Sequence, residues 1–332
     1  MEDRKKDHIN LAFQSQTLEI ENDNRFVYEP MLGTPSKGEM PEFTFLNKQL
    51  KSPLWASSMT GGTALAKTIN ENIARVCHDF GMGMGLGSCR IILEDNEYFE
   101  DFNVRQYIGE NLPLYANLGI AQVELLLKQK KTSVIVKLIE KLRADGLIIH
   151  VNPLQEWFQP EGNLYLQAPV DTIEQLLELV SFPIIVKEVG QGIGKESLRK
   201  LLQFPLQAIE FGAYGGTNFS LVEMYRNHPE MLEVYKPVAF AGQTAKNMVN
   251  DINSLQKSID IKCKELIVSG GIKNFLDGYY LTELSEMPAI YGQASTILKY
   301  AKESYESLYN FVDAQMKGFS LAKEFFRINN EA

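Results

Sequence analysis

A histidine, two amides and a carboxylate lie close together in the stretch HVNPLQE, residues 150–156. His150 and Asn152 end an apolar run and share one face of an extended chain, and Pro153 then stops strand pairing. Gln155 and Glu156 therefore begin a loop over the same strand end. Glu156 offers hard oxygen ligands of the kind that Mg²⁺ prefers, whereas the other three side chains form hydrogen bonds without adding negative charge. A single histidine here would suit a structural role, but the four side chains together favour a functional site.

Two stretches place paired glycines directly after apolar runs: GAYGGTN (212–218) and VSGGIKN (268–274). Glycine lets backbone N–H groups approach a phosphate closely, and the second stretch leads into an expected helix start. One such pair is typical of a tight turn. The two together favour a phosphate site built from two loops.

Basic residues occur at three further places. Lys187 follows the apolar run PIIV, where an anion or an electron-rich ring could be its partner, although a lysine reaching out to solvent is an equal alternative. Arg90, in GSCR (87–90), offers a fork of donors suited to phosphate, and a surface arginine is the alternative. The stretch RKKDHI (4–9) is the densest basic cluster and is either a solvated terminus or a cover over an anion.

Short apolar runs recur along the whole chain, and near-continuous apolar character indicates strands buried on both faces of a parallel sheet. Helical patterns separate them, so the sequence predicts a βα repeat and a single α/β domain over residues 1–332. The candidate strands are 53–62, 81–90, 113–119, 146–152, 182–190, 207–217, 237–244, 265–271 and 288–295.

Nine candidates exceed the eight strands of a (β/α)8 TIM barrel, and we expect PVAFAGQT (237–244) not to be a strand. A doubly wound open sheet is the alternative, disfavoured because GMGMGLG lacks the GxGxxG spacing of a first strand-to-helix turn. Residues 1–50 are expected to form an extension near the barrel mouth, and residues 296–332 one or two closing helices. In a barrel the polar strand endings all meet at one face.

Bulk composition excludes several classes. The net charge of -9 argues against a nucleic-acid or membrane-surface partner. The three cysteines have no CxxC spacing, which disfavours a disulfide framework or structural zinc and suits a reducing cytoplasm. The opening residues lack the apolar core of a leader, and no run approaches the ~18 apolar residues of a membrane span.

The motifs RKKDHI, SSMTGG, GSCR, ANLG, HVNPLQE, KEVG, GGT and SGGI, in this order, resemble those of type 2 isopentenyl diphosphate isomerase, an FMN-dependent barrel family. The resemblance runs from Arg4 to about Ala294. It implies that reduced FMN, with NADPH as electron source, and Mg²⁺ interconvert isopentenyl and dimethylallyl diphosphate without net redox. It also implies a homo-oligomer, either a tetramer or an octamer.

The resemblance assigns roles by position. The flavin would contact Ser58, Met59, Thr60, Ser88, Asn117, Lys187, Thr217, Gly270, Gly271, Gln293 and Ala294. The substrate would contact Arg4, Lys5, His8, Ser88, Arg90, His150, Asn152 and Gln155. Gln155, His150 and Asn152 would form the catalytic set, and Glu156 would hold Mg²⁺ against the diphosphate.

Two positions depart from the family pattern. Ser295 stands where the family usually has arginine, and Glu210 where it usually has aspartate, so both bear on flavin affinity. Two other functions stay open on these residues. One is an FMN oxidoreductase of the hydroxy-acid oxidase or dihydroorotate dehydrogenase type, and the other is a flavin-binding protein without catalysis. HVNPLQE and RKKDHI count against both, since neither needs a magnesium-diphosphate site.

Overall fold

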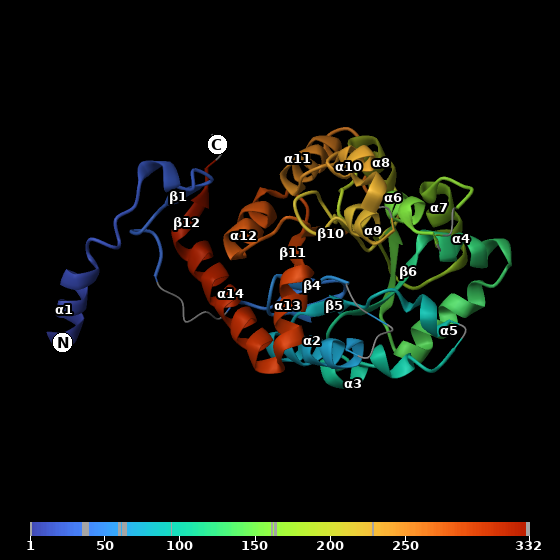
Figure 1. The fold of residues 1–332 in the computed structure, drawn as a ribbon, viewed down its shortest axis with the longest axis horizontal. Helices are drawn as coiled ribbons and strands as arrows, with labels where there is room; N and C mark the ends of the chain where they lie inside the picture. The colour runs from blue at the N-terminus through green and yellow to red at the C-terminus, as the bar shows by residue number, and fades with distance from the viewer. Residues whose placement is uncertain are drawn as a thin grey trace.

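The computed structural model describes residues 2–34, 40–58, 61, 65–93, 95–160, 162, 165–227 and 229–329. Eight parallel strands close into a barrel in the order β4 to β11, because β11 pairs with β4 through Gly292 and Trp55 (Figure 1). The strands are β4 (Leu54–Ala56), β5 (Gly83–Gly85), β6 (Leu114–Gly119), β7 (Gly146–Val151), β8 (Ile184–Glu188), β9 (Ala208–Glu210), β10 (Glu265–Ser269) and β11 (Ala289–Gln293).

The eight strands coincide with the eight apolar runs retained from the sequence, so the predicted TIM barrel is confirmed and the open sheet is excluded. Every residue of β6 and β10 is buried, as expected for strands covered on both faces. PVAFAGQT contributes no barrel strand: its first residues end α10 (Leu232–Ala239) and the rest form a loop.

Helices connect and follow the strands, and most of them surround the barrel. They are α2 (Ala66–Phe80), α3 (Arg105–Ile108), α4 (Ile120–Lys128), α5 (Thr132–Leu142), α6 (Pro153–Phe158), α7 (Pro169–Leu179), α8 (Lys195–Leu202), α9 (Phe219–Asn227), α11 (Ala245–Gln256), α12 (Phe275–Leu284), α13 (Ser295–Glu303) and α14 (Tyr305–Phe325). The predicted closing helices are α13 and α14. Among the described residues, none of the helices combines the length and the apolar character needed to cross a bilayer.

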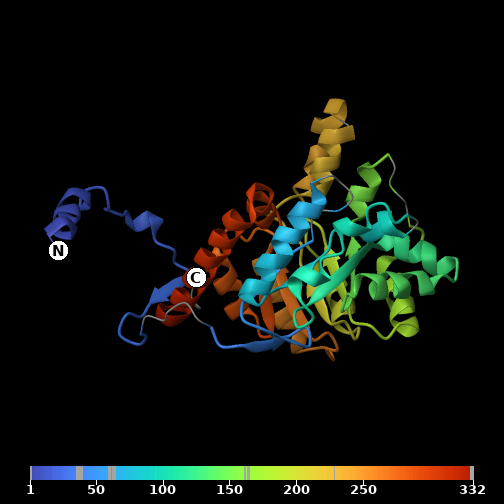
Figure 2. The ribbon, with the colours of Figure 1, turned by 90° about the horizontal axis from the view of Figure 1, so that it is seen from below.

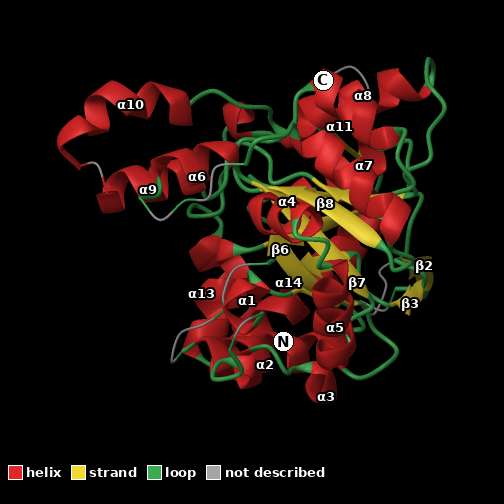
Figure 3. Ribbon diagram, turned by 90° about the vertical axis from the view of Figure 1, so that its right-hand side faces the viewer, coloured by secondary structure: helices red, strands yellow, loops and turns green. Residues whose placement is uncertain are grey.

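Helices α9 and α10 form an arm that projects from the barrel (Figures 2 and 3). In the sequence the arm lies between β9 and α11, so the crossover from β9 to β10 contains these two helices in addition to α11. Phe158 of α6 packs with Met224 and Ala239 of the arm in a small apolar cluster separate from the barrel core. This cluster joins the arm to α6.

The amino-terminal residues do not lie where the sequence analysis placed them. Helix α1 (Glu2–Leu11) lies apart from the barrel (Figures 1 and 2), and every side chain from Asp3 to Asn22 is exposed. Strand β1 (Phe26–Tyr28) pairs with β12 (Phe326–Ile328) at the end of α14. The expectation of an extension near the barrel mouth was wrong because these contacts depend on pairing with the far end of the chain.

The hairpin of β2 (Phe43–Phe45) and β3 (Lys48–Leu50) covers the amino end of the barrel, opposite the mouth. The Leu46 N–H donates to Glu265, the first residue of β10, at 3.0 Å. Lys48 Nζ lies 2.5 Å from the carboxylate of Asp145, which precedes β7. Because the barrel strands are parallel, these contacts fix the hairpin at their amino ends.

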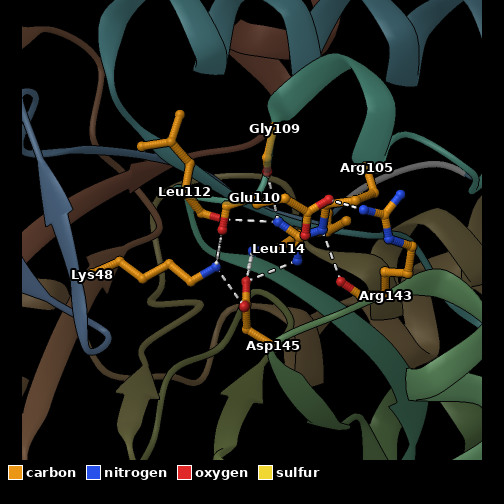
Figure 4. A network of polar contacts seen from close by, with 8 residues as sticks. All are labelled: Lys48, Arg105, Gly109, Glu110, Leu112, Leu114, Arg143 and Asp145. Atoms are coloured by element: carbon orange, nitrogen blue, oxygen red, sulfur yellow. Dashed lines mark hydrogen bonds and ion pairs between the residues drawn. The ribbon is translucent and has the colours of Figure 1, made fainter.

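A buried arginine holds this end together (Figure 4). The Arg105 side chain is 1% exposed and donates to Asp145 Oδ2 at 2.9 Å and to the carbonyls of Arg143, Gly109 and Leu112 at 2.8 to 2.9 Å. Asp145 also accepts from the Leu114 N–H at 2.9 Å. All the buried partners are satisfied, so this network is a structural clamp.

Candidate active site at the barrel mouth

The stretch HVNPLQE makes the turn from β7 into α6. Asn152 precedes the helix, and Pro153 occupies its first turn, where the missing N–H costs nothing. Asn152 Nδ2 donates to Gln155 Oε1 at 3.1 Å and to Glu156 Oε1 at 3.2 Å. Asn152, Gln155 and Glu156, three of the side chains singled out in the sequence, therefore form one hydrogen-bonded group.

His150 is held as a neutral acceptor. Asn117 Nδ2 donates to the carbonyl of Leu86 at 3.0 Å, so its oxygen faces His150 Nδ1 at 2.8 Å. The proton must then lie on Nδ1, which leaves the Nε2 lone pair free to accept. Burial, with the nearby charges of Lys187 and Arg90, lowers the pKa of His150 to about 3. His150 thus adds no charge to the site near neutral pH.

Lys187, at the end of β8, is the buried cation of the site. Its Nζ donates to the carbonyl of Glu188 at 2.9 Å and lies 4.0 Å from Glu210 Oε1. Glu210 is fully buried, and Ser269 Oγ donates to it at 3.5 Å. Glu210, which stands where the family usually has aspartate, therefore connects Lys187 with Ser269, the residue before the glycine loop that follows β10.

Glu188 fixes the loop that follows Lys187. Its Oε2 accepts from the N–H groups of Gly190, Gln191 and Gly192 at 2.7 to 2.8 Å. Burial is the largest influence on this carboxyl and raises its pKa, against the lowering effect of the three N–H donors. The Glu188 side chain therefore fixes the conformation of the loop at residues 190–192.

The two glycine loops meet as predicted. Gly270 and Gly271 have positive φ angles of 88° and 75°, and a Cβ at Gly270 would lie 2.1 Å from the carbonyl oxygen of Ala213. A Cβ at Gly216 would lie 3.0 Å from the Gly271 N–H nitrogen. Only glycine permits this close approach of two backbones. The loops form one wall of a cavity of about 240 Å³.

Three residues that line this cavity carry buried side-chain oxygens. Ser57 Oγ, Ser58 Oγ and Gln293 Oε1 are buried and have no hydrogen-bond partner within the part of the chain that the structure describes. Ser295 and the first residues of α13 line the same cavity, as does Lys273. Buried polar atoms need partners, so the cavity fits a polar, phosphate-bearing ligand such as FMN.

Three adjoining cavities follow one another across the mouth. The first, with the glycine loops, shares Ser58 and Lys187 with a second cavity of about 180 Å³. The second shares Ser88, His150 and Gln155 with a third of about 220 Å³, which Arg90 and Glu156 also line. The shared lining residues place a phosphate cradle, a buried lysine and a carboxylate in one continuous series.

The structure therefore brings most of the predicted site residues together. Those lining the three cavities are Ser58, Ser88, Arg90, Asn117, His150, Asn152, Gln155, Glu156, Lys187, Thr217, Gly270, Gly271, Gln293 and Ala294. Met59 and Thr60 lie outside the described residues. Arg4, Lys5 and His8 lie on α1, apart from the barrel of their own chain, so the structure does not bring them to this site.

Residues that the sequence analysis missed also line the site. Gln122, in the first turn of α4, and Gln159, just after α6, line the third cavity. A Cβ at Gly119 would lie 2.4 Å from Gln122 Oε1 and 2.9 Å from His150 Nε2, which explains the glycine there. Glu223, on α9, accepts from Gln155 and Gln159. Gln122 and Gln159 lie next to quoted motifs, whereas Glu223 is distant in sequence.

Magnesium is compatible with this donor set. No three histidine, cysteine, aspartate or glutamate side chains gather as a metal cluster among the residues that the structure describes. Mg²⁺ does not require such a cluster, since it is commonly bound by one or two carboxylates together with waters and substrate phosphates. Glu156 is 5% exposed and Asn152 Oδ1 is a buried acceptor with no partner in the described chain, so oxygen ligands are at hand.

Comparison with known proteins decides the family. The chain is 35% identical over 266 residues to isopentenyl-diphosphate delta-isomerase of Rickettsia prowazekii, covering 80% of this chain and 74% of that protein. The enzyme of the same name from Rickettsia akari is 34% identical, covering 78% of this chain and 72% of that protein. The chain belongs to the isopentenyl-diphosphate delta-isomerase family. The family predicted from the motifs is thereby confirmed. A search of protein-family profiles finds no match.

Solved structures confirm the fold of this isomerase-family chain. A double mutant of flavocytochrome b2 with pyruvate bound superposes with a TM-score of 0.63 at 14% identity, covering 95% of this chain and 78% of that one. A mandelate oxidase mutant with the monooxide FMN adduct gives a TM-score of 0.55 at 13% identity, covering 92% of this chain and 88% of that one. At these identities the likeness establishes the barrel alone.

Proposed function

We propose that this chain interconverts isopentenyl and dimethylallyl diphosphate by a 1,3-proton shift, using reduced FMN and Mg²⁺, with NADPH as the usual electron source. The observation that carries the proposal is the series of three cavities. It sets the glycine cradle and Lys187 beside a pocket lined by Glu156 and Arg90.

FMN would occupy the first cavity and extend toward the second. Gly270, Gly271 and Thr217 would receive its phosphate, and Lys273 offers positive charge near Ser295, where the family usually has arginine. Lys187 would lie against the electron-rich end of the ring and stabilise its anionic reduced form. When bound, reduced FMN supplies a ring nitrogen, N5, that can give and take a proton next to an alkene.

The third cavity suits a diphosphate. Arg90 supplies a forked donor group, and Glu156 would hold Mg²⁺ against the diphosphate oxygens. Neutral His150, together with Asn152 and Gln155, would contact the substrate and pack against its alkene without adding charge. By holding the alkene in one position, these residues would supply the protein's contribution to a reaction between weak acids and bases.

The amino-terminal motif enters the proposal through a second subunit. Helix α1 is exposed and lies away from its own barrel, so Arg4, Lys5 and His8 would meet a diphosphate in a neighbouring copy. This agrees with the homo-oligomer, tetramer or octamer, expected from the family. The protein would act in the cytoplasm, as expected from its cysteine usage.

Turnover in deuterated water with pre-reduced FMN tests the reaction. A proton shift through the site places deuterium in the product and, as the reverse reaction runs, in the recovered substrate, which mass spectrometry reads. Conversion without deuterium in either species would exclude the proton-shift mechanism. The absence of conversion, with FMN bound and reduced, would exclude the activity itself.

A further inference from the structure

The carboxylate of Glu223, on the projecting arm, reaches α6, the helix that carries Gln155 and Glu156. Glu223 lies on α9, is 3% exposed, and points toward α6 rather than toward solvent. Its Oε1 accepts from Gln159 Nε2 at 2.8 Å and from Gln155 Nε2 at 3.3 Å. Its Oε2 accepts from Arg226 Nη1 at 2.8 Å and Asn227 Nδ2 at 3.1 Å. Both oxygens are therefore occupied by donors.

This arrangement fixes the direction of the Gln155 amide. An ionised carboxylate only accepts hydrogen bonds, so Gln155 must turn its NH₂ group toward Glu223. Its oxygen then faces Asn152 Nδ2, which donates to it at 3.1 Å and to Glu156 at 3.2 Å. An ordered relay runs from Glu223 through Gln155 and Asn152 to Glu156, and every donor and acceptor in it has only one consistent direction.

We infer that Glu223 is a positioning residue that sets the orientation of Gln155 and, through Asn152, of the proposed metal ligand Glu156. The projecting arm is thus part of the active site's support and not merely an addition to the barrel. The inference rests on the proposed function, because the relay gains catalytic meaning only if Gln155 and Glu156 meet substrate.

The substitution Glu223→Gln separates this role from simple packing, since it keeps the size of the side chain. An amide can accept at only one of its two terminal atoms, whereas donors meet Glu223 at both. The charged Arg226 retains the oxygen, so an NH₂ group would face Gln155 and Gln159. Gln155 would turn its own oxygen toward that group and present NH₂ to Asn152, which is also a donor, and the relay would break.

The experiment compares Glu223→Gln with Glu233→Gln, the same chemical change at an exposed site on the same arm. Because hydrogen bonds to charged groups are lost, we expect Glu223→Gln to lower kcat/KM by about 10- to 100-fold, and Glu233→Gln to change it by less than about 2-fold. In a Gln155→Ala background the effect of Glu223→Gln should shrink to less than about 3-fold, because the relay is already cut. FMN affinity should not change in either variant.

Two results would overturn the inference: equal kinetics for the two variants, or a loss in Glu223→Gln that persists undiminished when Gln155 is alanine. Amide hydrogen exchange of residues 153–159 gives a reading that needs no turnover. Faster exchange in Glu223→Gln supports the positioning role, and unchanged exchange contradicts it. If the wild-type protein were inactive as an isomerase and Glu223→Gln still exchanged faster than the wild type, only the proposed isomerisation would be refuted.

Discussion

The neutral His150 gives a pH dependence of stability that can be worked out from its surroundings. Its ordinary pKa is 6.5, and burial beside Lys187 and Arg90 lowers the folded value to about 3. Between these values the unfolded chain binds a proton that the folded chain does not, so lowering the pH favours unfolding. At pH 5 this difference costs about 2 kcal/mol, whereas at pH 7 it costs about 0.2 kcal/mol.

The substitution His150→Gln removes this titration. We expect the free energy of unfolding of the wild type, measured with urea at fixed protein concentration, to fall between pH 7 and pH 5 by about 2 kcal/mol more than that of His150→Gln. His8→Gln is the matched control, because it makes the same substitution at an exposed side chain. Parallel pH profiles for wild type and His150→Gln would refute the neutral, desolvated histidine.

Three further predictions concern separate parts of the molecule. Arg105→Ala should lower the free energy of unfolding, measured with urea, by about 4 kcal/mol, because it leaves buried acceptors unpaired. Arg143→Ala, at a side chain that is 60% exposed, should lower it by less than about 1 kcal/mol. Gly270→Ala should weaken FMN binding at least about tenfold in a fluorescence titration, because the φ of Gly270 is 88° and the added Cβ would collide with Ala213. Gly194→Ala is the control: its Cβ would meet nothing within 4 Å, so FMN binding should not weaken. Glu156→Gln should raise the Mg²⁺ concentration needed for half-maximal turnover at least about tenfold, and an unchanged requirement would remove it as a ligand.

The barrel was predictable because its determinants are local. Each strand is an apolar run that ends in polar residues, and the fold requires only that such runs alternate with helices. The location of the candidate site at the barrel mouth could be predicted by the same rule, because parallel strands present their carboxyl ends together. The grouping of His150, Asn152, Lys187 and the glycine loops therefore needed no tertiary information beyond the barrel itself.

The rest depends on contacts between distant segments. Strand β1 pairs with β12 about 300 residues later, and the β2–β3 hairpin reaches Glu265 and Asp145, so no local pattern indicates where residues 1–50 lie. Glu223 was missed for the same reason: it appears in a helical stretch with no neighbouring motif. Its role becomes visible only when the arm packs against α6.

We propose that the mouth of this barrel uses a reduced flavin without consuming it. The most direct measurement is the ratio of dimethylallyl diphosphate formed to NADPH oxidised, under anaerobic conditions with FMN and Mg²⁺. We expect many product molecules for each NADPH, which is needed only to reduce the flavin once. Oxidation of NADPH in step with loss of substrate, with no dimethylallyl diphosphate formed, would contradict this proposal and favour an oxidoreductase.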